Sequence, residues 1–363
     1  MKIEKILPLL TLHGRTVYDD KRQALFCNWT CSGFSIGVKG SYLKIKVIAL
    51  EDQVPGIPGL PEPEPDWPCV GCTVNGSEKL INRTEIRENE KWIDLWQGKK
   101  GEHIIRLVKI SENARGKLAV SEIETDGELF KPEIKKSKTI EIVGDSITCG
   151  YGNEAPNNAF EFKSSQENGW MSYGAIAARK LGYEFSLICE SGICAIKPEQ
   201  PLFEMHAMED IYQYTDALYD KRRKEKPQKW DFKNNPSDIV VINLGTNDAN
   251  PIRFYREFKQ LEKIEAWFKK RYYQFIRQVR ELNGQDTFIC CTLGSIDYYF
   301  YHVIKEVVDE YKKETCDAKI CCFQYVPVNV PLELFGAAGH PSLKTHIRMG
   351  QQLVEYIKKY VGE

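Results

Sequence analysis

"IEIVGDSITCGYGNE", residues 140–154, is the stretch that decides the fold of the second part of the chain. It opens with isoleucine and valine, which are typical of β-strands, and then breaks off at Gly-Asp-Ser. The break is either a plain turn or the carboxyl end of a buried sheet strand that presents Ser146 in the loop beyond it. In the second case Ser146 is placed to act as a nucleophile.

From about residue 137 onward, strand-like and helix-like segments alternate. "EFSLICESG" and "SDIVVINLGTND" have the composition of buried strands, whereas "SYGAIAARKLG" and "SLKTHIRMGQQLVEYIKKY" are helix-like. This alternation predicts a parallel sheet with helices on both faces. We therefore expect a three-layer α/β domain over residues 136–363, with its chemistry beyond the carboxyl ends of the strands.

Residues 1–135 show a different pattern of short strand-like runs separated by turn signals, among them "YLKIKVIAL" and "KLAVSEIE". No stretch there keeps a helical period, so this part is predicted to be an all-β sandwich, with a jelly roll as one option. The insert "EDQVPGIPGLPEPEPDWP" contains six prolines. It predicts an extended loop at 55–68, whose role the sequence leaves open.

The overall composition excludes several classes of protein. At 363 residues two domains are expected, and a formal charge of -1 argues against a nucleic-acid-binding protein. No run approaches the length of a membrane-spanning helix, and "ILPLLTL" near the N-terminus is interrupted by Pro8 with no small-residue cleavage site after it. We predict a cytoplasmic protein that binds neither nucleic acid nor membrane, and leave a homo-oligomer open.

The chain has twelve cysteines, which we expect to be reduced and packed as small hydrophobic side chains. Two close pairs, Cys27 with Cys31 and Cys69 with Cys72, leave a four-thiolate zinc site as an alternative. Because these pairs lie in or beside strand-like runs, buried thiols are the preferred interpretation. We predict no metal and no cofactor.

Three predicted strand ends carry residues suited to acyl transfer. Such a reaction needs a hydroxyl nucleophile, a base and hydrogen-bond donors for the tetrahedral oxyanion. Ser146 can supply the hydroxyl, and its own N–H, the N–H of Gly192 and the side-chain amide of Asn247 can supply the donors. Asp145 and Asp248 are expected to support the site; an Asx-turn at Asn247 and Asp248 is the alternative.

Histidine is the usual base near neutral pH, and the chain has six. His340 stands in the glycine-flanked loop "FGAAGHPSLKTH" before the last helix, on the expected side of the sheet, and is the strong candidate. His346, inside that helix, is the weak one. Aromatic residues near the predicted strand-end loops could stack on a bound ligand, although packing is the more common role of any single one: Tyr151, Trp170, Tyr298 and Tyr299.

Four blocks, "GDSIT", the glycine of "ESGIC", "GTND" and "GHPS", follow one another as they do in the SGNH hydrolase superfamily. The longer "GDSITCGYGNE", together with "NLGTND" and the late "HPS", resembles carbohydrate esterase family 2. "GEHIIRLVKISE" resembles a strand of that family's N-terminal jelly roll. The resemblance therefore spans nearly the whole chain.

The resemblance implies a serine esterase that removes acetyl groups from acetylated plant poly- or oligosaccharides such as mannan or xylan. By matching position, Ser146 is the nucleophile, Gly192 and Asn247 are oxyanion donors, and His340 is the base. The wider superfamily has an aspartate three residues before this histidine, where the chain has Ala337. A Ser-His dyad is the natural interpretation, with Asp297 as the most plausible surrogate acid.

Several aspects of function stay open at this stage. A lipase or thioesterase of the same superfamily is one alternative, although no amphipathic lid is apparent. A catalytically silent carbohydrate-binding protein is another. The resemblance leans toward the primary 6-hydroxyl of hexoses, and the sequence does not decide between mannan, xylan and other glycans.

Overall fold

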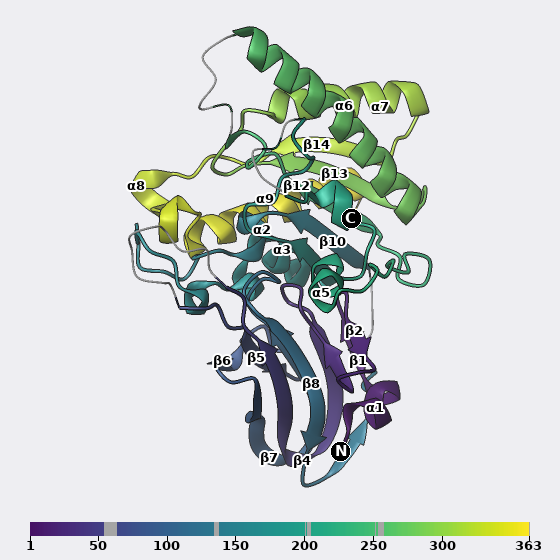
Figure 1. The fold of residues 1–363 in the computed structure, drawn as a ribbon, viewed down its shortest axis with the longest axis vertical. Helices are drawn as coiled ribbons and strands as arrows, with labels where there is room; N and C mark the ends of the chain where they lie inside the picture. The colour runs from purple at the N-terminus through teal and green to yellow at the C-terminus, as the bar shows by residue number, and fades with distance from the viewer. Residues whose placement is uncertain are drawn as a thin grey trace.

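The computed structural model describes residues 1–53, 64–133, 138–199, 201, 205–250, 252 and 258–362. They form two sheets, an antiparallel one from the first part of the chain and a parallel one from the second, as Figure 1 shows. The predicted boundary at 135/136 lies outside the described residues. The fold class expected from the sequence, a β-sandwich of the jelly-roll kind followed by a three-layer α/β domain, is confirmed.

The first sheet has nine strands, with the main order β2-β3-β8-β4-β7-β5-β6 and with β1 and β9 both paired to β4. Its strands are β1 Thr11–His13, β2 Val17–Asp19, β3 Ala24–Phe26, β4 Gly33–Leu50, β5 Cys69–Val74, β6 Ile81–Glu85, β7 Glu90–Lys109, β8 Lys117–Glu124 and β9 Glu128–Phe130. The two longest, β4 and β7, curve strongly in Figure 1, so one sheet curls around its own core.

Alternation along these strands places the core inside the curl. On β4, Leu43, Ile45 and Val47 are buried while the residues between them are half-buried. This is the period of a strand with one face in a core and one toward solvent. A short helix that the sequence did not predict, α1 (Ile3–Ile6), adds two buried isoleucines to the same core.

The second sheet is wholly parallel, with the order β11-β10-β12-β13-β14. Its strands are β10 Thr139–Gly144, β11 Glu184–Cys189, β12 Ile239–Asn243, β13 Phe288–Leu293 and β14 Ile320–Gln324. The chain passes from β10 to one neighbour, β11, and then crosses to the other neighbour, β12. Such a switch point opens a crevice at the carboxyl ends of the strands, where ligands bind in open α/β sheets.

Helices cover both faces of this sheet (Figure 1). The helices are α2 Ser146–Cys149, α3 Tyr173–Leu181, α4 Met208–Ile211, α5 Ala217–Arg223, α6 Phe258–Asn283, α7 Tyr301–Thr315, α8 Val330–Glu333 and α9 Leu343–Val361. Helices α3 and α9 pack on one face, with Tyr173 and Leu353 in the same cluster as Val241 of β12. The neighbouring Val240 and Ile242 face a cluster that includes residues of α6 and α7.

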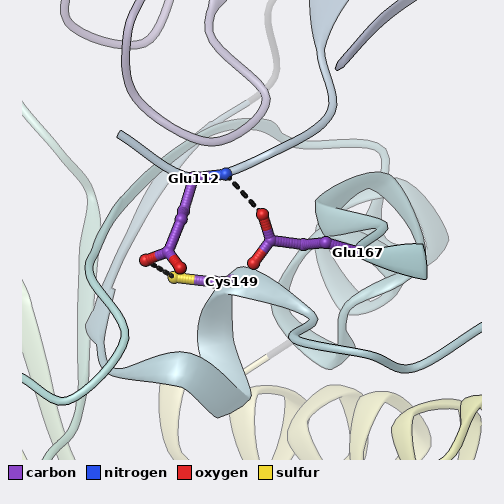
Figure 2. Close-up of side chains that lie close together, drawn as sticks. All are labelled: Glu112, Cys149 and Glu167. Atoms are coloured by element: carbon purple, nitrogen blue, oxygen red, sulfur yellow. Dashed lines mark hydrogen bonds between the residues drawn. The ribbon is translucent and has the colours of Figure 1, made fainter. Parts of the chain in front are cut away.

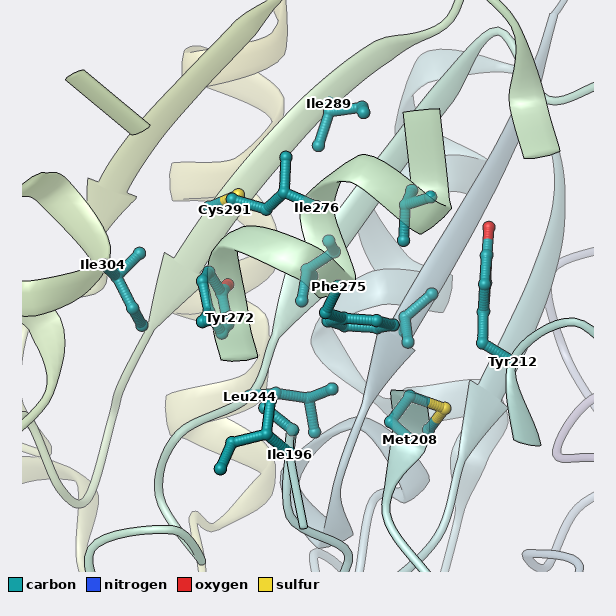
Figure 3. Close-up of a cluster of buried hydrophobic side chains, with 14 of the residues drawn as sticks. Ile196, Met208, Tyr212, Leu244, Tyr272, Phe275, Ile276, Ile289, Cys291 and Ile304 are labelled. Carbon is teal, nitrogen blue, oxygen red and sulfur yellow. The ribbon is translucent and has the colours of Figure 1, made fainter. Parts of the chain in front are cut away.

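Figure 3 shows the second of these clusters, where Tyr272, Phe275 and Ile276 of α6 lie over Ile289 and Cys291 of β13. Both faces of β12 are therefore apolar, which explains why "IVVIN" reads as an unbroken hydrophobic run.

Two predicted segments differ from the structure or fall partly outside it. The sequence "LFEMHAMEDIYQYTDALY", residues 202–219, predicts one helix, but its described part, from residue 205, contains α4 and the start of α5. A turn at 212–213 and a bridge between Tyr214 and Lys229 separate these two short helices. Most of the proline-rich loop, residues 54–63, lies outside the described residues, but its two ends pair at Asp52 and Asp66. None of the helices described is both long and apolar enough to cross a membrane.

Buried polar contacts join the two sheets. The guanidinium of Arg15 binds the carboxylate of Glu141 on β10 at 3.1 Å and the carbonyl oxygen of Tyr212 at 2.5 Å. The side chain of Asn28 donates to Asp216 at 2.7 Å. Because an unpaired charge in such a place is costly, these pairs hold the two parts of the chain in one arrangement.

Candidate active site

Ser146 and His340 come together although 194 positions separate them in the chain, with His340 Nε2 2.9 Å from Ser146 Oγ. Ser146 opens helix α2 directly after β10, and Asp145 caps that helix by accepting from the N–H of Ile147 at 3.0 Å. The residue Ser146 is 8% exposed, so the hydroxyl lies in a largely enclosed site. This is the spacing needed for proton transfer between a nucleophile and its base.

The other ring nitrogen of His340 faces the chain itself. Nδ1 lies 3.2 Å from the carbonyl oxygen of Ala338, two residues earlier. The loop can turn back in this way because Ala338 and Gly339 both have positive φ, 47° and 72°. Burial lowers the pKa of His340 from its ordinary value of 6.5, against smaller opposing effects of the carbonyls of Ala338 and Ala337. A lowered pKa keeps the imidazole neutral, as a base requires.

The loop after β11 brings Gly192 to the same edge of the sheet. Gly192 has a φ of 82°, is exposed, and has open space where a Cβ would stand. It occupies the third position of a turn closed by the N–H of Ile193 and the carbonyl of Glu190 at 3.3 Å, a position that favours glycine. In the described part of the chain nothing accepts a hydrogen bond from the N–H of Gly192, which leaves that donor available.

Asn247 follows β12, and its amide nitrogen donates to the carbonyl oxygen of Ile193 at 3.0 Å. One amide hydrogen therefore fixes the Gly192 loop, and the second is left for a ligand. The next residue, Asp248, accepts from the N–H groups of Ala195 at 2.9 Å and Ile196 at 3.2 Å. Asn247 and Asp248 thus both anchor the loop that carries Gly192.

The two aspartates predicted to support the site are buried. Burial raises the pKa of Asp145 and that of Asp248 to about 7, against the opposing effect of the N–H groups that each accepts. The carboxylate of Asp145 accepts from the main chain of the nucleophile turn, and that of Asp248 accepts from the main chain of the Gly192 loop. Each side chain therefore holds a segment of main chain in place.

The four aromatic residues predicted as stacking candidates have different surroundings. Tyr151 lies at the site, with its ring centroid 4.3 Å from that of His340. Tyr298 is half-buried, and Tyr299 donates its hydroxyl to Glu265 at 2.8 Å. Trp170 is a correction: it is buried and donates to the carbonyl of Glu78 at 2.7 Å, so its ring is not available to a sugar.

Two other predictions concern acids and bases near the site. Asp297 accepts from the N–H of Tyr299 at 2.9 Å, and the ring of His340 is bonded to Ala338 and Ser146 rather than to a carboxylate. His346 is buried in α9, where its Nδ1 accepts from the N–H of Tyr173 at 3.2 Å. Burial lowers its pKa to about 3.

Sequence reasoning missed two residues beside the site. Phe160 is 93% exposed, and the carbonyl of the preceding Ala159 accepts from the N–H of Ala338 in the His340 loop. Glu112, between β7 and β8 of the first sheet, accepts from the N–H of Ser191 at 2.5 Å. Phe160 carries no local sequence signal, since "NNAFEF" is an ordinary loop sequence. Glu112 ends the stretch "GEHIIRLVKISE", which is interpreted only as a strand of the jelly roll.

Among the described residues one group could hold a metal: Glu112, Cys149 and Glu167, whose ligand atoms lie within 4.8 Å of one another (Figure 2). The guanidinium of Arg115 already binds Glu112 at 3.1 Å, and its positive charge would repel a metal ion bound to the same carboxylate. The four cysteines of the zinc alternative do not come together as such a group. Cys72, for example, donates to the carbonyl of Leu95 at 2.9 Å, and burial raises its pKa to about 12.

The chain is similar to several known proteins. Residues 142–319 match the model of the GDSL-like lipase/acylhydrolase family. The Cellulase/esterase CelE of Acetivibrio thermocellus is 30% identical over 269 residues, which cover 72% of this chain and 31% of that protein. An acetylxylan esterase / glucomannan deacetylase of Cellvibrio japonicus is 28% identical over 199 residues, which cover 52% of each. The chain thus spans about a third to a half of the length of these two relatives.

The similarity extends to solved structures over nearly the whole chain. A family two carbohydrate esterase from Clostridium thermocellum, in complex with cellohexaose, superposes with a TM-score of 0.81 at 25% identity and covers 97% of this chain and 99% of that one. Residues 142–319 thus form a domain of the GDSL-like lipase/acylhydrolase family, and the chain as a whole has the two-part fold of the family two carbohydrate esterases, as its motifs predict.

Proposed function

We propose that the chain is a carboxylic ester hydrolase that removes O-acetyl groups from plant-derived poly- or oligosaccharides. The observation that carries this proposal is the 2.9 Å contact between Ser146 Oγ and His340 Nε2 at the carboxyl edge of the parallel sheet. A serine activated by a neutral histidine is the arrangement that attacks ester carbonyls.

In this mechanism Ser146 Oγ attacks the acetyl carbonyl carbon while His340 Nε2 takes its proton. The negative oxygen of the tetrahedral intermediate would accept from three donors: the N–H groups of Ser146 and Gly192 and the free amide hydrogen of Asn247. His340 then gives its proton to the departing sugar oxygen, which leaves an acetyl-enzyme. Water, deprotonated by His340, releases acetate and restores the serine.

The substrate class follows from relatives and from the site together. The curated relatives are described as a cellulase/esterase and as an acetylxylan esterase / glucomannan deacetylase, and the solved structure holds cellohexaose. Phe160, exposed beside the His340 loop, gives a flat apolar face of the kind on which sugar rings stack. We favour acetyl groups on the primary 6-hydroxyl of manno- or gluco-configured substrates, with xylan as the competing substrate.

An assay of acetate release tests the proposal. The wild type should release acetate from a small chromogenic acetate and from acetylated mannan oligosaccharides, and Ser146→Ala should not. Exhaustive chelation should leave the rate unchanged, because fixed amides rather than a metal stabilise the oxyanion. Release of long-chain fatty acid or thiol in preference to acetate would favour a lipase or thioesterase. No release of any acid would favour a carbohydrate-binding protein.

We also propose that the protein works in the reducing cytoplasm. All twelve cysteines are free, and the Sγ atoms of Cys290 and Cys321, 3.3 Å apart, form a hydrogen bond rather than a disulfide. Free thiols at this density are typical of a reducing compartment. Thiol counting on protein isolated under rapid alkylation would check this, and disulfide-bonded protein would contradict it.

A further inference from the structure

We infer that Glu112, a residue of the first sheet, is a positioning residue for the oxyanion-binding loop, so that the first sheet completes the active site. The inference rests on the proposed esterase function and adds a residue from outside the family domain of residues 142–319. It stands on three contacts of one buried carboxylate and two of the main chain of the same residue.

Glu112 reaches two catalytic segments at once. Its Oε2 accepts from the N–H of Ser191 at 2.5 Å and from Sγ of Cys149 at 3.4 Å (Figure 2). Ser191 immediately precedes Gly192, and Cys149 is the last residue of α2, the helix that begins at Ser146. One carboxylate group therefore ties the proposed oxyanion loop to the nucleophile turn.

The carboxylate itself is held firmly. Glu112 is fully buried, its Oε1 accepts from Nε of Arg115 at 3.1 Å, and its main-chain N–H donates to Glu167 at 2.8 Å. The buried amine of Lys109 donates to the main-chain carbonyl of Glu112 at 2.6 Å. An ionised acceptor that is buried, and whose side chain and main chain are both held by hydrogen bonds, makes a stronger and less mobile hydrogen bond than a neutral acceptor does.

Other contacts anchor the Gly192 loop on both sides of the glycine. Before it, the N–H of Glu190 donates to the carbonyl of Gly144 at 3.4 Å. Beyond it, Asn247 binds the carbonyl of Ile193, and Asp248 binds the N–H groups of Ala195 and Ile196. Glu112 is the anchor nearest the donor, since it binds the N–H of Ser191, the residue directly before Gly192. The N–H of Gly192 donates to an oxygen that becomes negative only in the transition state. A displaced Gly192 N–H should therefore reduce kcat rather than weaken substrate binding.

The neighbouring Glu167 is a matched control. It is also fully buried in the same group, and its burial, together with the nearby Glu112, raises its pKa well above the ordinary range. In the described part of the chain its carboxyl group binds only the N–H of Glu112, through Oε2, and its Oε1 has no hydrogen-bond partner. Glu167→Gln keeps the shape of the side chain and an acceptor oxygen for that one contact.

Glu112→Gln keeps the shape but leaves a single acceptor oxygen. The charged guanidinium of Arg115 binds that oxygen more strongly than the neutral N–H of Ser191 does. The amide nitrogen of the glutamine therefore points toward the N–H of Ser191, and two hydrogen-bond donors face each other without an acceptor. We expect kcat for a small acetate ester to fall about 10- to 100-fold with KM within about threefold of wild type. Glu167→Gln should stay within about twofold of wild type in both constants.

Three results would overturn the inference: an unchanged kcat in folded Glu112→Gln, a change confined to KM, or an equal loss of kcat in Glu167→Gln. If Glu112→Gln does not fold, Ser191→Pro tests the same bond, since proline lacks the N–H and suits the second position of this turn. It should lose kcat similarly, and normal kcat would again overturn the inference. An inactive wild type in the same assay would instead sink the esterase proposal itself.

Discussion

His340 Nδ1 lies 3.2 Å from the main-chain carbonyl oxygen of Ala338, two residues before it in the same loop. A carbonyl oxygen can only accept, so the ring proton sits on Nδ1, and Nε2 faces Ser146 as an acceptor. The tautomer that a carboxylate fixes in a catalytic triad is fixed here by the backbone. Ala337, which takes the place of the superfamily's aspartate, has no side-chain acceptor to offer.

The dyad predicts that Asp297 is dispensable for catalysis. Asp297→Asn should lower kcat by less than about tenfold, because it removes no contact to His340, whereas losing the acid of a true triad costs about 10⁴-fold. His340→Ala, measured alongside, should lose about 10³-fold or more. A loss in Asp297→Asn that approaches the loss in His340→Ala would contradict the dyad.

The pH dependence of kcat/KM follows from the burial of His340. Its pKa is lowered from 6.5, and catalysis needs the neutral imidazole, so kcat/KM should hold its plateau down to a pH below 6.5 and then fall as the ring is protonated. The measurement is kcat/KM on a chromogenic acetate across the acid range. An acid limb centred above pH 7 would mean that another group controls the rate.

Asn247→Ala should lower kcat about 10²- to 10³-fold, the usual effect of losing one oxyanion donor. The same change releases the carbonyl of Ile193, so part of the loss would come from the Gly192 loop. Steady-state kinetics separate the roles, since an effect mainly on KM would make Asn247 a contact to the bound sugar instead.

Much of the fold could be predicted because its signals are local. The strands of the parallel sheet are buried on both faces, so "IEIVG" and "IVVIN" appear as continuous apolar runs. The curling of β4 and β7 into one sheet depends on pairings between residues far apart in the chain, which no local pattern specifies. The short helix α1 was missed because four residues give no measurable period.

The site shows the same division. Ser146, Gly192 and Asn247 follow strand ends, and His340 precedes the last helix, so topology alone predicts their meeting. Trp170 was misjudged because a tryptophan in a loop looks accessible until its partners are known, and here Arg179 and Phe185 pack on its ring.

The roles of Glu112 and Phe160 could not be found from the sequence by this reasoning, although Glu112 ends the stretch "GEHIIRLVKISE" that resembles a jelly-roll strand. The importance of Glu112 comes from a contact across 79 positions, between the two sheets. That of Phe160 comes from its exposure beside a loop far along the chain.

Phe160 predicts a difference between small and large substrates. Phe160→Ala should raise KM for acetylated oligosaccharides about three- to tenfold, because stacking of a sugar on an aromatic face is worth roughly 1 kcal/mol, and should leave kinetics on a small chromogenic acetate unchanged. Trp92→Ala is the control, since Trp92 is also exposed but lies on β7 of the first sheet. Equal KM values for the oligosaccharide in wild type and Phe160→Ala would remove Phe160 from the binding surface.

The central claim is that Ser146 carries the acetyl group during turnover. Acid quenching of the enzyme during hydrolysis of an acetylated mannan oligosaccharide, followed by peptide mass spectrometry, tests it most directly. The account predicts an acetyl group on Ser146 in the wild type, and neither that adduct nor acetate release in folded Ser146→Ala. Acetate release by Ser146→Ala at a rate near that of the wild type would contradict it.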